Sequence, residues 1–175
     1  MSPKLNRLRS VSLCVMLLLP GTACLQAENA ILESTADASS PGGPASGKAR
    51  ELQGPGVMCF SFKTWTIFKW NVESADLFIH VSKGAAPTSL EIAVIPTPWT
   101  EAAPPEASAS WKFVPHQSVS EPQGWVSIKV DPKLVEEITA GKGHGLAVRV
   151  KSAIGINTRE SLAFRPYLII NGGRP

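Results

Sequence analysis

The chain has 175 residues, of which 17 are lysine or arginine and 14 are aspartate or glutamate, for a formal net charge of +3. This length suits one folded domain with extensions. The positive excess belongs to Lys4, Arg7 and Arg9, and from Cys24 onward 14 basic and 14 acidic residues cancel. The neutral remainder lacks the basic balance typical of nucleic-acid-binding proteins, so we expect no nucleic-acid partner.

The first 27 residues have the pattern of a secretory signal peptide. The basic residues precede an apolar run, Val11–Leu19, which ends at Pro20. Small residues follow, and we expect cleavage near residues 23–27, after Ala23 or Ala27. The run is too short for a membrane-spanning helix, which needs ~20 apolar residues, and no later segment approaches that length. We therefore expect a secreted or cell-surface or periplasmic protein without a transmembrane span.

Two cysteines bear on the fate of the chain after secretion. The four residues that end at Cys24, "GTAC", partly match a bacterial lipobox, although Gly21 stands where that motif usually has leucine. Cys24 is therefore lipidated, paired in a disulfide with Cys59, or removed with the signal peptide, and the sequence leaves all three open. Cys59 lies between Met58 and Phe60, a context typical of a small buried apolar residue rather than a nucleophile.

A segment rich in small and polar residues follows the signal peptide. Residues 28–56 include "STADASSPGGPASGK", which has almost no large apolar side chains. Such a composition buries too little surface to offset the entropy of ordering, so we expect a disordered linker. The folded domain is then expected over residues 57–173.

Short runs that alternate between apolar and polar residues fill the rest of the chain. Glycine and proline separate these runs, which favours antiparallel strands joined by turns. One segment favours a short helix instead, because Asp131 can cap it, Pro132 suits its first position and Gly141 follows its end. We therefore predict an all-β fold, an antiparallel jelly-roll β-sandwich with one short helix. The predicted strands are "VMCFSF", "TWTIFKW", "ADLFIHV", "SLEIAVI", "WVSIKV", "GLAVRV" and "PYLIIN".

The order of these segments resembles the DNRLRE-type domain of bacterial secreted and surface proteins. The similarity covers about residues 57–171 and rests on "ESADLFIHV", "IAVIPTPWTEAAPP", "GWVSIKVDPKLVEEITAGKGHGLAVRV" and "INTRESLAFRPYLII". It implies a jelly-roll of the carbohydrate-binding-module kind. It also implies structural roles for the matching positions Trp99, Trp125, Arg159, Glu160 and Pro166. The prodomain of transforming growth factor-β proteins is similar more distantly.

The chain departs from the DNRLRE pattern at its start. That family usually has a further strand before the Phe-x-Phe strand, and here the position falls in the expected linker. The sandwich would then lack its first strand or borrow one from a partner. Thr158 also replaces the serine that usually precedes the Arg-Glu pair.

No motif in the sequence indicates catalysis. The histidines and cysteines lack the spacing of a metal site, so we expect no metal and no cofactor. Structural calcium is possible in a sandwich module, but no aspartate-rich loop supports it. The most suggestive residues are the tryptophans Trp65, Trp70 and Trp111, which could form an aromatic platform for sugar rings. Burial in the core is the more frequent role of tryptophan, and Trp111, after a Pro-rich polar stretch, is the best exposed candidate.

These observations favour a secreted, non-catalytic binding or adhesive module for carbohydrate or a cell-surface polymer. The alternative is a structural or assembly domain that binds a surface protein by strand addition at an open sheet edge. A hydrolase is least favoured, because no pair of carboxylates is singled out by its spacing. The ligand and the oligomeric state are not indicated by the sequence.

Overall fold

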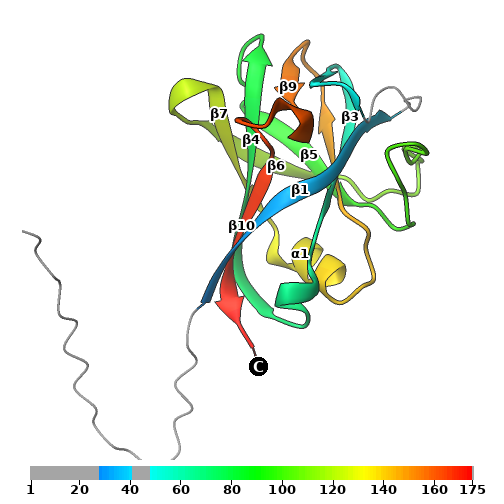
Figure 1. The fold of residues 1–175 in the computed structure, drawn as a ribbon, viewed down its shortest axis with the longest axis vertical. Helices are drawn as coiled ribbons and strands as arrows, with labels where there is room; N and C mark the ends of the chain where they lie inside the picture. The colour runs from blue at the N-terminus through cyan, green and yellow to red at the C-terminus, as the bar shows by residue number, and fades with distance from the viewer. Residues whose placement is uncertain (1–27, 41–47, 175) are drawn as a thin grey trace, which may run out of the picture.

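The computed structural model describes residues 28–40 and 48–174. The expected signal peptide and Cys24 lie outside these residues. Within them, no helix combines the length and the apolar character needed to cross a membrane. The structure is mostly β-strands with one α-helix, α1, at Pro132–Thr139 (Figure 1). The strands are β1 (Glu28–Ser40), β2 (Glu51–Gln53), β3 (Gly56–Phe62), β4 (Asn71–Lys83), β5 (Ser89–Val94), β6 (Val114–Ser120), β7 (Trp125–Val130), β8 (Leu146–Val150), β9 (Gly155–Asn157) and β10 (Tyr167–Gly173).

The sheet closes on itself into an antiparallel barrel of eight strands. Neighbouring strands follow the order β10-β1-β3-β8-β5-β6-β7-β4, and pairing of β4 with β10 completes the ring. The short strands β9 and β2 extend outward from β4. The predicted jelly-roll sandwich is therefore wrong, because a sandwich consists of two separate packed sheets.

Two long strands explain the closure. Strand β1 pairs with β10 through Glu28–Glu33 and with β3 through Ser34–Ser40, with a register shift between Ser34 and Ala36. Strand β4 likewise pairs with β10, β7 and β9 along its 13 residues. A long strand that changes partners along its length carries the sheet around a corner, and a bulge increases the bend.

The expected disordered linker is wrong for the residues that the structure describes. Strands β1 and β2 both lie within residues 28–56, and β1 fills the place next to β3 that was expected to lack a strand. Leu32 is the main apolar anchor of β1, and the buried Ser34, Ala38 and Ser40 are small enough to pack closely. The backbone ladders to β10 and β3 stabilise this segment, and composition alone does not reveal such ladders. Because β1 occupies the position next to β3, the missing first strand no longer supports strand addition by a partner.

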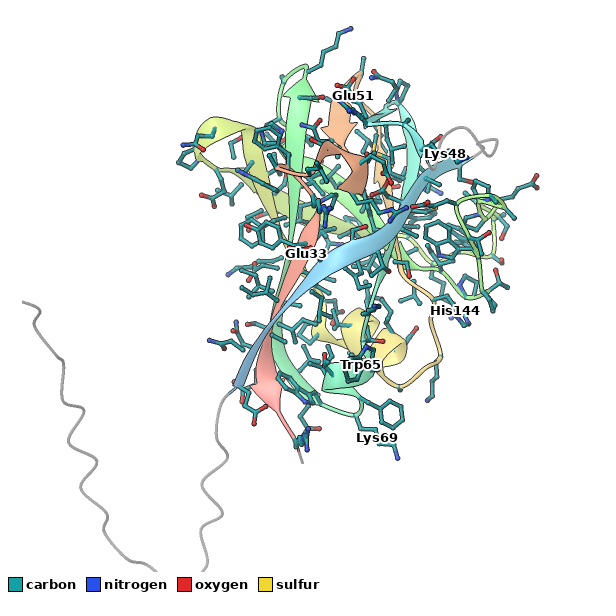
Figure 2. The ribbon with its side chains drawn as sticks, in the orientation of Figure 1. Glu33, Lys48, Glu51, Trp65, Lys69 and His144 are labelled. Atoms are coloured by element: carbon teal, nitrogen blue, oxygen red, sulfur yellow. The ribbon has the colours of Figure 1, made fainter. Side chains whose placement is uncertain are left out.

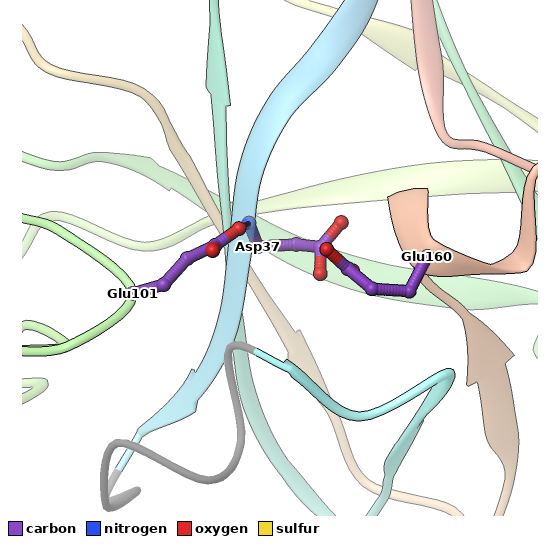
Figure 3. A group of neighbouring side chains, drawn as sticks. All are labelled: Asp37, Glu101 and Glu160. Atoms are coloured by element: carbon purple, nitrogen blue, oxygen red, sulfur yellow. Dashed lines mark hydrogen bonds between the residues drawn. The ribbon is translucent and has the colours of Figure 1, made fainter.

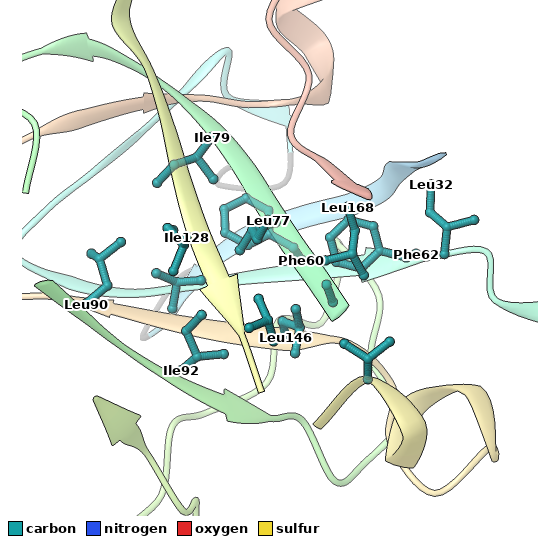
Figure 4. Packing of buried hydrophobic residues seen from close by; sticks show 14 of the residues in the cluster. Leu32, Phe60, Phe62, Leu77, Ile79, Leu90, Ile92, Ile128, Leu146 and Leu168 are labelled. Atoms are coloured by element: carbon teal, nitrogen blue, oxygen red, sulfur yellow. The ribbon is translucent and has the colours of Figure 1, made fainter. Parts of the chain in front are cut away.

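The core fills the barrel with the apolar side chains of the alternating strands (Figure 4). Alternation correctly predicted strands β3, β4, β5, β7, β8 and β10. The predicted strand "TWTIFKW" is wrong: Trp65–Ile67 form the 3-10 helix η2, whose hydrogen bonds are local, such as Trp70 N–H to Ile67 O at 3.1 Å. Labelled core residues in Figure 4 are Leu32, Phe60, Phe62, Leu77, Ile79, Leu90, Ile92, Ile128, Leu146 and Leu168.

The predicted helix and the predicted burial of Cys59 are confirmed. The side chain of Asp131 accepts a hydrogen bond from Lys133 N at 3.0 Å, Pro132 is the first helical residue, and Gly141 follows with φ of +74°. Cys59 is fully buried, and this burial raises the pKa of its thiol to about 12. A thiol that stays protonated is a poor nucleophile, so Cys59 acts as a core residue.

Candidate functional site

The first feature of the site is an aspartate on the core side of β1. Asp37 pairs with the core residue Phe60 in the β1–β3 ladder, so its side chain leaves the sheet on the same side. The bulge between Ser34 and Ala36 sets this parity, since one extra residue reverses which side chains face inward. Asp37 is 0% exposed as a result.

One oxygen of the Asp37 carboxylate accepts hydrogen bonds from a backbone donor and from a side-chain donor. Oδ2 of Asp37 accepts a hydrogen bond from Arg159 N–H at 2.7 Å and a longer one from Ser34 Oγ at 3.5 Å. Oδ1 has no partner among the described residues. Burial raises the pKa of Asp37 to about 7, although the Arg159 N–H bond lowers it, and the nearby negative charges of Glu160 and Glu101 raise it further. The carboxyl group therefore holds a proton more tightly than an exposed aspartate.

Arg159 joins the acidic residues. It lies at the start of the 3-10 helix η4 (Arg159–Ser161), and its Nε and Nη2 donate to the two carboxylate oxygens of Glu101 at 2.6 and 2.7 Å. Its Nε also lies 3.0 Å from Oε1 of Glu160. The bond to Glu101 raises the pKa of the guanidinium, so it remains charged. The resulting four-residue group of Asp37, Glu101, Arg159 and Glu160 is called the acidic cluster below.

The acidic cluster is assembled from three distant parts of the chain (Figure 3). Asp37 belongs to β1, Glu101 to the connection between β5 and β6, and Glu160 to η4. One carboxylate oxygen of each lies within 4.8 Å of the others. From the sequence, a structural role was predicted for Arg159 and Glu160, whereas neither Asp37 nor Glu101 was predicted to join them. The backbone-to-side-chain contact between Asp37 and Glu101 spans 64 positions, so no local sequence pattern indicates it.

An open groove runs beside the acidic cluster along β1, and we call it the β1 groove. It consists of two adjoining hollows of about 410 and 600 Å³ that share Ser34, Arg159 and Arg165. The first hollow is also lined by Lys48, Arg50, Glu160 and Leu162. The second is also lined by residues of β1 and by Lys63, Trp65 and Thr66. Figure 2 shows Lys48 near the C-terminal end of β1 and Trp65 close to α1. Trp65 lines the second hollow together with residues 31–35 of β1.

The three tryptophans of the expected platform do not form one surface. Trp65 is 74% exposed and lines the β1 groove, whereas Trp70 and Trp111 are buried. Trp70 packs in the main core. Trp111, expected at an exposed loop rim, instead covers Val57 and other residues on the outer side of β3, β5 and β8. The prediction of Trp111 as an exposed binding residue is therefore wrong, and Trp65 alone of the three is available to a ligand.

The residues singled out by the family resemblance lie at contacts between elements. Trp99 Nε1 donates to His144 O at 3.0 Å, and Pro166 O accepts from Ser34 N at 2.9 Å. Trp125 lies in a half-exposed aromatic group on the outer face of β4, β7 and β10. Its ring contacts His80 and Tyr167, both at centroid distances of 5.3 Å. In the runs "ADLFIHV" and "WVSIKV", His80 and Trp125 lie on the side opposite the aliphatic residues Leu77, Ile79, Val126 and Ile128, which is the sequence signal for this group.

Comparison with protein-family models and with curated proteins finds no match for the chain. The similarity to DNRLRE-type domains therefore stays a prediction from the sequence.

Proposed function

We propose that the protein is a secreted, non-catalytic binding module for carbohydrate or another cell-surface polymer, and that the polymer lies in the β1 groove. The observation that carries this proposal is the exposed indole of Trp65 in the β1 groove. An exposed tryptophan offers a flat apolar face on which a sugar ring stacks, while neighbouring polar groups bind its hydroxyls.

The charge of the β1 groove favours an acidic polymer. Lys48, Arg50 and Lys63 are exposed, and Arg165 is half-buried. Among the described residues, Arg165 has an acidic partner in Glu33 at 3.3 Å, and no acidic side chain pairs with the other three. Carboxylate or sulfate groups on a polymer would form charge-assisted hydrogen bonds with such unpaired lysine and arginine side chains.

The carboxylates beside the groove are poorly placed for hydrolysis. Asp37 has a raised pKa, as a general acid requires, but it is 0% exposed and cannot reach a bound chain. Both oxygens of Glu101 are held by Arg159. A glycoside hydrolase needs two carboxyl groups that converge on the scissile bond, and this arrangement favours binding without cleavage.

Binding to a panel of polymers tests the proposal. Polygalacturonate and heparin serve as acidic polymers, and dextran and xylan as neutral ones, with affinity measured by tryptophan fluorescence and calorimetry. We expect Trp65→Ala to weaken binding by about 10-fold, since aromatic stacking and the lost apolar contact together contribute ~1–2 kcal/mol. Phe68→Ala is the matched control, because Phe68 is also exposed and near Trp65 but does not line the groove.

Binding of no polymer in the panel would contradict the proposed function, and so would equal affinity of Trp65→Ala and the wild type. The contribution of the basic side chains to binding is measured separately. Affinity for the acidic polymers should fall as salt increases and should fall in Lys48→Gln and Arg50→Gln, because screened or missing charges attract less. Preference for neutral polymers would reject the acidic ligand and leave the groove as the binding site.

A further inference from the structure

The acidic cluster contains two buried carboxylate oxygens that no donor in the described part of the chain satisfies. Asp37 Oδ1 and Glu160 Oε2 are both buried and have no hydrogen-bond partner among the described residues. The whole side chain of Asp37 is buried and lies between Glu101 and Glu160 (Figure 3). Buried acceptors are almost always met by a donor, an ordered water or an ion, because an unmet one loses its hydration without compensation.

Arg159, the cation of the acidic cluster, already contacts other carboxylate oxygens than the two without a partner. The side chain of Arg159 contacts both oxygens of Glu101 and Oε1 of Glu160, and its backbone N–H contacts Oδ2 of Asp37. Arg159 contacts neither Asp37 Oδ1 nor Glu160 Oε2, the two oxygens without a partner among the described residues. With Asp37 ionised, the three carboxylates and one guanidinium carry two net negative charges, which one divalent cation would balance.

The number and chemistry of the ligands in the acidic cluster favour one divalent cation over others. The three carboxylates supply ligand oxygens that all lie within 4.8 Å of one another. Mg²⁺ usually keeps several waters and is held by one or two carboxylates, whereas Ca²⁺ accepts more protein oxygens in a flexible arrangement, so three protein carboxylates suit Ca²⁺ better. Carboxylate oxygens without nitrogen or sulfur donors also suit a hard cation. We propose that Asp37, Glu101 and Glu160 bind a calcium ion through Asp37 Oδ1, Glu160 Oε2 and a carboxylate oxygen of Glu101.

The position of the acidic cluster indicates how the ion would enter and which elements it would connect. Arg159 and Glu160 line the β1 groove, so the ion reaches the carboxylates from the solvent of that groove. Calcium would then tie β1 to η4 and to the connection between β5 and β6. Since it binds the folded chain only, calcium should raise the melting temperature progressively, roughly with the logarithm of its concentration above the dissociation constant.

Calcium binding is tested directly by calorimetry and thermal unfolding. After EDTA treatment and dialysis, the protein is titrated with CaCl2 and, separately, with MgCl2. We expect saturable binding of one Ca²⁺ per chain, a higher melting temperature, and weaker binding of Mg²⁺. Asp37→Asn and Glu160→Gln should each weaken calcium binding by ~10-fold or more, because each removes a charged ligand at nearly constant shape. Glu106→Gln, an exposed glutamate in the same connection as Glu101, should behave as the wild type.

Two results would overturn the calcium site. One is a wild type that neither binds Ca²⁺ in calorimetry nor gains thermal stability from it, which would leave a proton or water as the partner of Asp37. The other is calcium binding that Asp37→Asn and Glu160→Gln leave unchanged, which would place the ion elsewhere. Glu160→Gln keeps the test decisive if Asp37→Asn fails to fold. Polymer binding does not enter these measurements, so this inference and the proposed function succeed or fail separately.

Discussion

Asp37 is a carboxylate in a buried position, where its charged form is disfavoured. It is a carboxylate on the core side of a strand, next to Glu101 and Glu160, with Arg159 as the nearby cation. Burial disfavours its charged form, and the two glutamates add to that effect. The folded state therefore takes up a proton that the unfolded chain releases at lower pH, which couples folding to pH.

The pH dependence of stability follows from this difference. In EDTA, the free energy of unfolding should fall as pH rises from about 4 to about 7, because the pKa of Asp37 is about 7 when folded and near its ordinary value of 3.8 when unfolded. The contribution is complete below the unfolded pKa and is lost as pH rises through the folded one. The fall is at most ~1.4 kcal/mol per pH unit.

Urea unfolding at a series of pH values measures this slope. Asp37→Asn should remove most of it, because the amide does not titrate, while Glu106→Gln should keep it. The same pH dependence in Asp37→Asn as in the wild type would show that Asp37 does not titrate with a raised pKa in the folded chain.

At the scale of elements, α1 is the clearest case of an element whose bounds are determined by neighbouring residues in the sequence. Asp131 caps it by accepting a hydrogen bond from Lys133 N, and Pro132 suits its first position. Its buried face, Val135 and Ile138, packs on the core beside β4 and β5. The cap and the apolar spacing are properties of neighbouring residues, so this helix could be predicted within a residue or two.

Removal of the cap tests the contribution of Asp131. Asp131→Ala should lower the free energy of unfolding by ~1 kcal/mol, because it leaves an N–H of the first helical turn unmet. Asp131→Asn, whose side-chain oxygen can still accept that bond, should lose only a small part of this. Chemical denaturation compares the two variants, and equal losses would mean that the negative charge of Asp131 matters rather than the cap.

At the scale of the whole molecule, closure of the barrel depends on β1. This strand is the neighbour of both β10 and β3, so it occupies a complete position in the ring. Its Leu32 belongs to the main core, and its Asp37 belongs to the acidic cluster. A segment with this many long-range partners is part of the cooperative fold.

Truncation tests whether residues 28–56 are part of the barrel or form the linker that their composition predicted. A chain that begins at Val57 lacks β1 and β2, and we expect it to lose cooperative thermal unfolding and to aggregate through the exposed edges of β3 and β10. A chain that begins at Glu28 keeps both strands and serves as the control. Cooperative unfolding of the shorter chain at an unchanged temperature would show that β1 is dispensable.

The sequence by itself determined the local structure of this protein. Alternation of apolar and polar residues set the inner and outer faces of β4, β7 and β8, because side chains of a strand point to opposite sides in turn. Turn residues bounded these strands, and the cap and glycine at either end bounded α1. Each of these features depends on residues close together in the chain.

Only the tertiary structure decided how the sheet closes and what the acidic cluster contains. The composition of residues 28–40 gives no sign of a strand, because β1 is stabilised by backbone bonds to β10 and β3 rather than by large apolar side chains. The bulge after Ser34 turns Asp37 inward, where Glu101 and Arg159 meet it from distant segments. Such pairings depend on which segments the closed barrel brings together, and no local pattern encodes that.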